Sequence, residues 1–244
     1  MRLILEKYFV STIGLFLVAL GIALSIISNL GTSPLSCPAY ILSLKFTPTV
    51  GEFTIIINML LILIQLAVLR RSFKLKYLMQ IPATLIFGYM IDFWVWVLGT
   101  VIPGTLVSRW LLVIAGSLIS AVGVSLEVAA QAWMLSAEMT VYAFTKVCDK
   151  PFSTLKIIMD CLYVVIAGCL SYLLFGNVFG AGHVASLQDI VTAEAEGIVI
   201  GIGTVALAVL PGLCMKLTDP LVDTLMAGIR LNAEDNKWES TRQR

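Results

Sequence analysis

The amino-acid sequence predicts an all-α, polytopic membrane helix bundle with about six transmembrane helices. Of its 244 residues, 59% are hydrophobic and 13% are charged, and the mean hydropathy is +0.97. A soluble domain is about 45–50% apolar and about 25% charged, so a water-soluble core could not absorb this excess. The apolar residues also gather in long runs, and a helix that crosses the bilayer core needs roughly 20 of them.

Six apolar runs are candidates for membrane spans, at residues 8–29, 53–69, 77–99, 110–133, 155–175 and 195–215. Backbone polar groups find no water inside hydrocarbon, so each run is expected to be an α-helix. The first run is too long for the apolar part of a signal peptide and no A-x-A site follows it, so we expect it to be retained. Residues 1–215 are expected to form one transmembrane domain.

The distribution of lysine and arginine predicts the orientation. If the N-terminus lies inside, all 16 of these residues except Lys45 and Arg109 face the cytoplasm. The opposite topology reverses the bias, which the positive-inside rule disfavours. The basic segment 70–76 is the strongest single signal. Both termini are therefore predicted to be cytoplasmic.

Two connections between the runs do not resemble ordinary loops. Residues 30–50 and 134–153 are too apolar for solvated loops and too short to cross the bilayer. Each contains a segment that we expect to form a short helix, at about 33–45 and 136–147. Both segments fit re-entrant half-helices, and helices lying flat on each membrane surface are the alternative.

Residue types at the start of each short helix suggest how it begins. Thr32 or Ser33 is a candidate N-cap of the first, with Pro34 in its first turn. Ser136 is a candidate N-cap of the second, with Glu138 in its first turn. The helix N-termini would then offer backbone N–H groups to a ligand.

Residues 216–244 follow the last apolar run. Asp219 and Pro220 are typical of a helix start, and apolar residues recur from there to about Arg230. We expect a short amphipathic helix on the cytoplasmic membrane surface, because such a helix buries one apolar face at the interface. The polar residues 232–244 are expected to be a disordered tail.

The sequence carries a weak internal repeat with a spacing of 102 residues. Without a gap across 19–66, the alignment matches Gly21 with Gly123, Asn29 with Gln131, Tyr40 with Tyr142 and Asn58 with Asp160. Each copy, at about 8–99 and 110–215, holds three spans and one half-helix, and an odd number of spans inverts the second copy. A 3+3 inverted repeat with broken helices is typical of secondary transporters, and channels use it too.

Polar side chains within the apolar runs are the candidates for a substrate or ion pathway, because a polar group in lipid is costly. Glu127 is the strongest, since a central acidic residue costs roughly 2.5–3.5 kcal/mol on the insertion scale. Gln131 follows one turn later on the same helix face. Asp160 lies at a similar depth in the next span, and Glu138 heads the nearby half-helix. Together they are expected to form a cation or proton site near the inner side.

These acids also have a structural alternative. Lys156 lies four residues before Asp160, so the two can form an ordinary ion pair on one helix. Glu127 can instead extend its carboxylate toward the interface or become protonated. Both interpretations remain open at the level of sequence.

The first copy offers Ser25, Asn29 and Asn58 at the equivalent outer positions, and all three are uncharged. Thr32 and Ser33, at the start of its half-helix, are further pathway candidates. The two halves are thus similar in their apolar pattern and different in charge. This difference suits a pathway in which one acidic half couples transport to an ion. Sequence drift would produce the same difference.

Other polar or small residues carry weaker predictions. Asp92 is expected to be an interfacial anchor toward the outer side, and Gln65 and Gln80 are weaker pathway candidates. The last run carries Gly197, Gly201, Gly203 and Thr204. Small residues at this spacing allow helices to approach closely, so helix packing is the first expectation for them. A bare backbone that lines a cavity is the alternative.

Several classes of function find no support in the sequence. The five cysteines form no C-x-x-C pair, and the one histidine, His183, has no partner at ligand spacing, so we expect no metal and no cofactor. No serine–histidine–acid set, phosphate-binding loop or zinc-protease motif is present, so we expect no enzyme and no catalytic residues. The net charge of +1 does not indicate a nucleic-acid partner.

Short glycine-rich motifs carry a family resemblance. They are Gly21, the stretch Asn29-Leu-Gly-Thr-Ser-Pro34, Gly51, Asn58 and the stretch Gly201-Ile-Gly-Thr204. In these motifs the chain resembles the YczE/YyaS/YitT family of bacterial integral membrane proteins, with the YczE-like branch closest, over about residues 8–215. The resemblance implies a multi-pass protein of the bacterial plasma membrane. It implies no substrate, and no site residue is carried over from it. The second copy departs from the pattern, because residues 133–136 replace the glycine–proline turn.

The sequence thus favours a small-molecule or ion transporter embedded in the lipid bilayer, with a pathway between two inverted halves. The alternative is a non-transporting accessory or regulatory membrane protein that scaffolds a partner complex. That alternative needs only the bundle and the cytoplasmic tail. The oligomeric state is left open.

Overall fold

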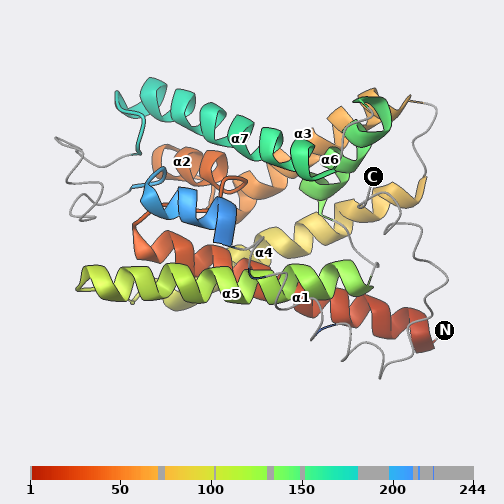
Figure 1. The fold of residues 1–244 in the computed structure, drawn as a ribbon, viewed down its shortest axis with the longest axis horizontal. Helices are drawn as coiled ribbons and strands as arrows, with labels where there is room; N and C mark the ends of the chain where they lie inside the picture. The colour runs from red at the N-terminus through yellow and green to blue at the C-terminus, as the bar shows by residue number, and fades with distance from the viewer. Residues whose placement is uncertain are drawn as a thin grey trace.

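The computed structural model describes residues 2–70, 75–101, 103–130, 135–148, 152–180, 198–210, 214 and 222. Its elements, in order, are α1 (Arg2–Ser28), α2 (Cys37–Lys45), α3 (Val50–Leu69), the 3-10 helix η2 (Leu75–Met79), α4 (Gln80–Leu98), α5 (Leu106–Ala130), α6 (Ser136–Cys148) and α7 (Phe152–Phe175). Residues 202–210 are helical as well. The described residues contain no strand beyond an isolated bridge between Gly180 and Ile198. The predicted all-α membrane bundle is confirmed (Figure 1).

Five helices are long and apolar enough to cross a membrane: Lys7–Ser28, Val50–Leu69, Tyr77–Leu98, Leu106–Glu127 and Thr154–Phe175. They coincide with the first five predicted runs. The sixth run, 195–215, lies partly outside the described residues, and its described part is helical at 202–210. The predicted surface helix and tail lie outside them too, apart from Val222, which is buried against Ala130.

The outer face of the helices is apolar. Trp96, Leu173, Val205 and Val107 each expose more than two thirds of their surface. Exposed apolar surface on this scale marks contact with another apolar phase. The surface of the bundle therefore suits lipid, which agrees with the membrane fold.

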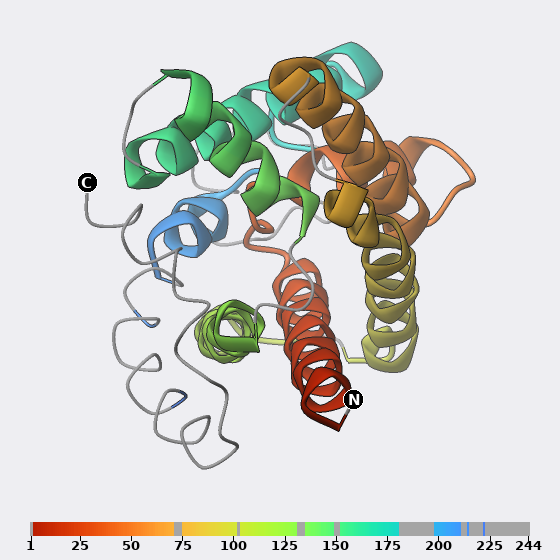
Figure 2. The same ribbon diagram turned by 90° about the vertical axis from the view of Figure 1, so that its right-hand side faces the viewer.

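Antiparallel helices α1 and α5 cross in close contact through glycines. A Cβ atom on Gly14 would lie 2.7 Å from the carbonyl oxygen of Gly123, and one on Gly21 would lie 2.6 Å from that of Gly116. Viewed along the helices, α1 and α5 lie beside each other, while α3, α6 and α7 form a second group (Figure 2). Any larger residue at these positions would push the two helices apart.

The contacts between elements follow a reciprocal pattern. At the spacing of 102 residues, α1, α2 and α3 fall on α5, α6 and α7. Helix α3 packs on α6, and α7 packs on α2. Likewise α2 contacts α3, and α6 contacts α7. In Figure 1, α2 lies toward the left end of the bundle and α6 toward the right end.

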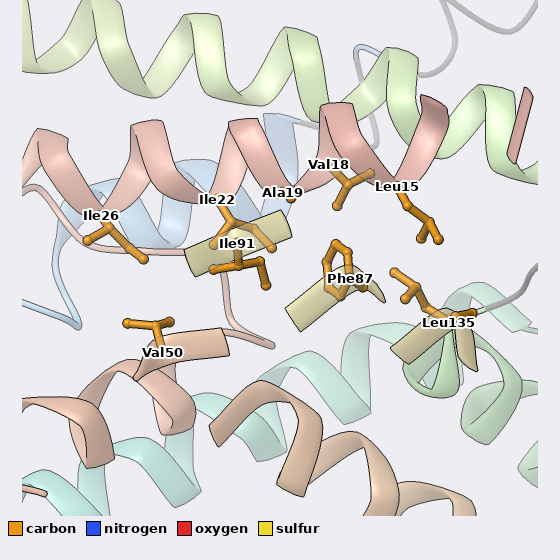
Figure 3. Packing of buried hydrophobic residues seen from close by; sticks show 10 residues of the cluster. Leu15, Val18, Ala19, Ile22, Ile26, Val50, Phe87, Ile91 and Leu135 are labelled. Atoms are coloured by element: carbon orange, nitrogen blue, oxygen red, sulfur yellow. The ribbon is translucent and has the colours of Figure 1, made fainter. Parts of the chain in front are cut away.

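A core of aliphatic and aromatic side chains fills the space between α1 and α4. Figure 3 shows Leu15, Val18, Ala19, Ile22 and Ile26 of α1 facing Phe87 and Ile91 of α4, with Val50 and Leu135 at either end. The spacing of the α1 residues is the helical period of one buried face. Leu135 directly precedes α6, so this core also fixes where the second half-helix begins.

The first half-helix begins later than predicted. Helix α2 starts at Cys37 rather than near residue 33, and neither Thr32 nor Ser33 caps it. The carbonyl of Ser33 accepts the N–H groups of Ser36 at 2.9 Å and Cys37 at 3.0 Å in a tight turn. The N–H of Thr32 donates to the carbonyl of Val199 at 3.0 Å. This tertiary contact holds the preceding backbone outside the helix, and sequence alone does not reveal it.

The second half-helix matches its prediction in extent but not in its cap. Ser136 is the first residue of α6 rather than its N-cap. The first turns of α6 are buried at Ser136, Ala137, Met139 and Thr140. In α2, Cys37 is likewise buried. Both short helices pack against long ones: α2 against α3 and α7, and α6 against α3 and α7.

Candidate polar site at the second half-helix

A buried carboxylate joins the end of α5 to the start of α6. Glu127 is 4% exposed, and its Oε1 atom accepts the N–H of Leu135 at 2.9 Å. The first N–H groups of a helix have no partner within the helix and carry partial positive charge. Glu127 therefore satisfies a backbone donor at the N-terminus of α6 and places a negative charge where the helix dipole stabilises it.

Three charged side chains meet between α6 and α7. The ammonium of Lys156 lies 3.1 Å from the carboxylate of Asp160 on its own helix and 3.9 Å from that of Glu138 on α6. The pair within one helix is thus present, as the structural alternative expected. The same ammonium also reaches a second helix, so the ion pair belongs to a site rather than to a single helix surface. The carboxylates of Glu127 and Glu138 repel each other when both are charged.

Two oxygen atoms in this cluster have no hydrogen-bond partner among the described residues. They are Oε2 of Glu138 and the hydroxyl of Tyr163, which is 5% exposed. Tyr163 follows Asp160 by about one turn on α7, and its hydroxyl interacts electrostatically with Glu138 and Asp160. Buried polar atoms are normally paired, so two unpaired acceptors beside three carboxylates indicate room for a ligand or ordered water.

A second polar group anchors the other side of the α6 N-terminus. The side chains of Gln65 and Gln80 bond to each other, with N–O distances of 3.0 and 3.2 Å. Gln65 also donates to the carbonyl of Ser136 at 2.9 Å and to the hydroxyl of Thr140 at 3.0 Å. The hydroxyl of Ser136 lies 3.3 Å from that of Thr84. All five side chains are buried, so the hydrogen bonds of the two amide groups connect α3, α4 and α6 in the interior.

Sequence reasoning ranked Gln65 and Gln80 only as weaker candidates and did not identify Thr84, Thr140 or Tyr163. A signal for the two glutamines exists, because each is a large polar side chain within a long apolar run. Nothing in the sequence indicates that they bond to each other. The assignment of partners depends on how α3 and α4 are rotated against α6.

The candidates of the first half are engaged with one another and with the last helix. The hydroxyl of Ser25 lies 2.9 Å from that of Thr32, and Ser33 donates to the hydroxyl of Ser36 at 3.0 Å. The side-chain oxygen of Asn29 accepts the N–H of Ile198 at 3.0 Å. These groups tie the turn after α1 to the segment that precedes helix 202–210.

The small residues at the start of the last helix pack closely against this turn. Gly31 has φ +119°, which favours glycine, and a Cβ atom there would lie 2.4 Å from the Thr204 hydroxyl. The N–H of Gly203 donates to the carbonyl of Leu30 at 2.8 Å, and a Cβ on Gly201 would lie 2.3 Å from that carbonyl. The structure thus places Gly201, Gly203 and Thr204 in a close backbone contact.

Asn58 and Asp92 occupy separate positions. Asn58 is 1% exposed, and its side-chain N–H donates to the carbonyl of Thr54 at 2.8 Å. Its side-chain oxygen has no hydrogen-bond partner among the described residues. Asp92 accepts the Thr49 hydroxyl at 2.5 Å and the Gly51 N–H at 2.7 Å. The structure therefore gives Asp92 a specific role that the sequence did not predict, because it supports the capping of α3.

Gln131, Gly197 and His183 lie outside the described residues. Within the part of the chain that the structure describes, no three histidine, cysteine, aspartate or glutamate residues are grouped closely enough to hold a metal ion. The acids of this site come from three helices, and two of them, Glu138 and Asp160, share Lys156. This arrangement suits ionic and hydrogen-bonding contacts more than metal coordination.

Long apolar helices around a buried polar interior define a polytopic helical membrane protein. The chain belongs to a family of unknown function, DUF6198, whose model matches residues 5–220. It is similar to the uncharacterized protein YyaS of Bacillus subtilis (strain 168), with 28% identity over 221 residues, 89% of this chain and 94% of that protein. The expected resemblance to the YczE/YyaS/YitT family is confirmed. No solved structure matches the chain.

Proposed function

We propose that the protein is a small-molecule or ion transporter of the bacterial plasma membrane, with both termini in the cytoplasm. One observation carries the proposal: Glu127, Glu138 and Asp160 gather around the start of a half-helix inside an apolar bundle. Charged groups at such a place are costly, and in membrane proteins they mark ion and substrate pathways. The half-helix supplies the broken backbone that transporter binding sites use.

The contacts between α1 and α5 support an inverted repeat. At the spacing of 102 residues, Gly14 corresponds to Gly116, and Gly21 corresponds to Gly123. Exchanging the two halves therefore turns the contact of Gly14 with Gly123 into the contact of Gly116 with Gly21. Both contacts are present, and the two helices are antiparallel. Such an exchange corresponds to a two-fold axis perpendicular to the helices, which would lie in the membrane plane.

The difference between the halves supports a coupling role for one of them. The described pathway candidates of the first half are uncharged, and all but Asn58 are hydrogen-bonded to other side chains or to the last helix. In the second half, Glu138 and Asp160 share one ammonium, and Oε2 of Glu138 and the Tyr163 hydroxyl have no hydrogen-bond partner among the described residues. This half therefore offers both the charge and the unpaired groups that ion binding needs. Glu127 and Asp160 are the residues that we propose bind the coupling ion or proton.

Flux measurements in proteoliposomes test the proposal. The purified chain is reconstituted and supplied with a panel of radiolabelled amines, amino acids and inorganic cations, with and without a proton gradient. We expect flux of at least one class, lost in the variant that combines Glu127→Gln and Asp160→Asn. Glu52→Gln is the matched control, because Glu52 caps α3 away from the cluster and glutamine preserves its hydrogen bond.

Two outcomes would contradict the proposal in different ways. Flux that survives the double substitution unchanged removes the coupling role of Glu127 and Asp160. No flux for any member of the panel, together with a stoichiometric partner that is lost when residues 217–244 are deleted, establishes the accessory function instead.

A further inference from the structure

We infer that the cluster between α6 and α7 binds a small organic ammonium ligand, whose charged head takes the position beside Glu138 that Lys156 now holds. This inference deepens the proposed function, because it names the class of substrate and so rests on the pathway lying here. Binding can be measured without transport, so the two ideas can fail separately.

The charge of the cluster favours a cationic ligand. Glu138 and Asp160 bring two carboxylates, and the described side chain that pairs with them, Lys156, offers one cation. Glu127 adds a further carboxyl group that interacts with Glu138. The polar groups that α3 and α4 direct to the α6 N-terminus are the uncharged amides of Gln65 and Gln80. An anion would meet a surplus of like charge here, whereas a cation would relieve it.

Two oxygen atoms without a hydrogen-bond partner among the described residues mark where the charged head of the ligand would bind. Oε2 of Glu138 and the hydroxyl of Tyr163 are both buried and find no hydrogen-bond partner in the part of the chain that the structure describes, and the hydroxyl interacts electrostatically with Glu138 and Asp160. An ammonium carries three donors, so one head group can serve several acceptors at once.

The geometry suits an ammonium better than a metal ion. Among the described residues no set of three acidic, cysteine or histidine side chains is close enough to hold a metal. Lys156 already places an ammonium 3.1 Å from Asp160 and 3.9 Å from Glu138. The cluster therefore already binds an ammonium group. The longer contact, between Lys156 and Glu138, is the one that a ligand can replace.

An apolar wall beside the acids suits the carbon body of such a ligand. Ala137, Leu61 and Tyr163 form one buried cluster, against which Ile57 and Met159 pack. Asn58 lies about one turn before Leu61 on the buried face of α3, and its side-chain oxygen is unpaired within the described ranges. A small alkylammonium can thus place its head at Glu138 and its chain against this wall.

Lys156 competes with such a ligand for Glu138, because its own ammonium group occupies the same position. Its side chain is 31% exposed, so it can move away from Glu138 while keeping its closer contact with Asp160. An incoming ammonium would then take the contact with Glu138. Because a bound competitor lowers apparent affinity by the fraction of sites that it occupies, removing Lys156 should strengthen binding.

Equilibrium binding of radiolabelled butylammonium to the full chain in lipid nanodiscs tests the inference. We expect saturable binding that sodium and acetate do not compete and that unlabelled butylammonium does. Lys156→Met should tighten it about tenfold, since one competing ammonium is removed. Glu138→Gln should abolish it, Tyr163→Phe should weaken it several-fold, and Glu52→Gln should leave it unchanged.

Separate results would overturn the inference. They are equal competition by sodium, binding that persists in Glu138→Gln, or equal affinity in wild type and Lys156→Met. If Lys156→Met does not give a monodisperse protein, Lys156→Gln is used, and the wild-type competition by sodium decides the question on its own. Butylammonium binding without flux of any member of the panel would retain the site and contradict transport. Flux of another solute without butylammonium binding would support transport and refute this binding site.

Discussion

The carboxylate of Glu127 accepts the backbone N–H of Leu135 at 2.9 Å, eight residues further along the chain. This bond crosses the break between α5 and α6 and holds the second half-helix against the end of a membrane span. The residue that sequence analysis ranked first for chemistry is therefore also part of the framework. The effect of the negative charge of Glu127 therefore has to be measured separately from the effect of its hydrogen bond.

Substitutions at Glu127 can make that separation. Glutamine keeps an oxygen that accepts the Leu135 N–H but removes the charge, whereas alanine leaves a buried donor unpaired, at a cost of about 1–3 kcal/mol. We expect Glu127→Ala to lower the thermal unfolding temperature in detergent clearly more than Glu127→Gln does. Equal unfolding temperatures for the two variants would mean that this bond does not hold α6 in place.

The amide pair of Gln65 and Gln80 should behave as a coupled unit. Replacing either glutamine alone with leucine removes the donor to the buried amide oxygen of the other and should destabilise the fold by about 1–3 kcal/mol. The double substitution should cost less than the sum of the two, since both ends of the bond are then removed. Chemical unfolding of the four proteins in a double-mutant cycle measures this coupling. A cycle that closes additively would contradict the observed bond.

The glycine crossing of α1 and α5 should not tolerate larger residues. Gly21→Val would push a side chain into the carbonyl of Gly116, which lies 2.6 Å from the Cβ position. We expect about 1–3 kcal/mol of destabilisation from overpacking, measured by unfolding in detergent. Gly104→Val is the matched control, because nothing lies within 4 Å of a Cβ atom there. Similar losses in both variants would show a general effect of glycine replacement rather than a clash.

Charge distribution predicts the sidedness of the bundle, and labelling can determine it. In a background without native cysteines, Ser72→Cys falls in the basic connection predicted to be cytoplasmic, and Thr105→Cys falls in the connection predicted to be outside. A maleimide that does not cross membranes should label Thr105→Cys in intact cells and Ser72→Cys only after lysis. The reverse pattern would place both termini outside.

Hydropathy along the chain is sufficient to locate the first five spans and both short helices. The reason is physical: the need for about 20 apolar residues to cross a bilayer acts on each segment separately. The match of α1, α2 and α3 to α5, α6 and α7 at a spacing of 102 residues has the same origin, because each element is defined by its own residues.

Partners of the polar side chains could not be predicted in this way. The bond of Gln65 to Gln80 and the sharing of Lys156 between Asp160 and Glu138 depend on how separate helices are rotated and packed. The late start of α2 depends likewise on a contact between Thr32 and Val199, far apart in the chain. The sequence by itself determined which segments leave water, because transfer into lipid is a local property. Only the tertiary structure decided which buried polar atoms are satisfied and which remain open to a ligand, because hydrogen bonds require two groups to meet within about 3 Å.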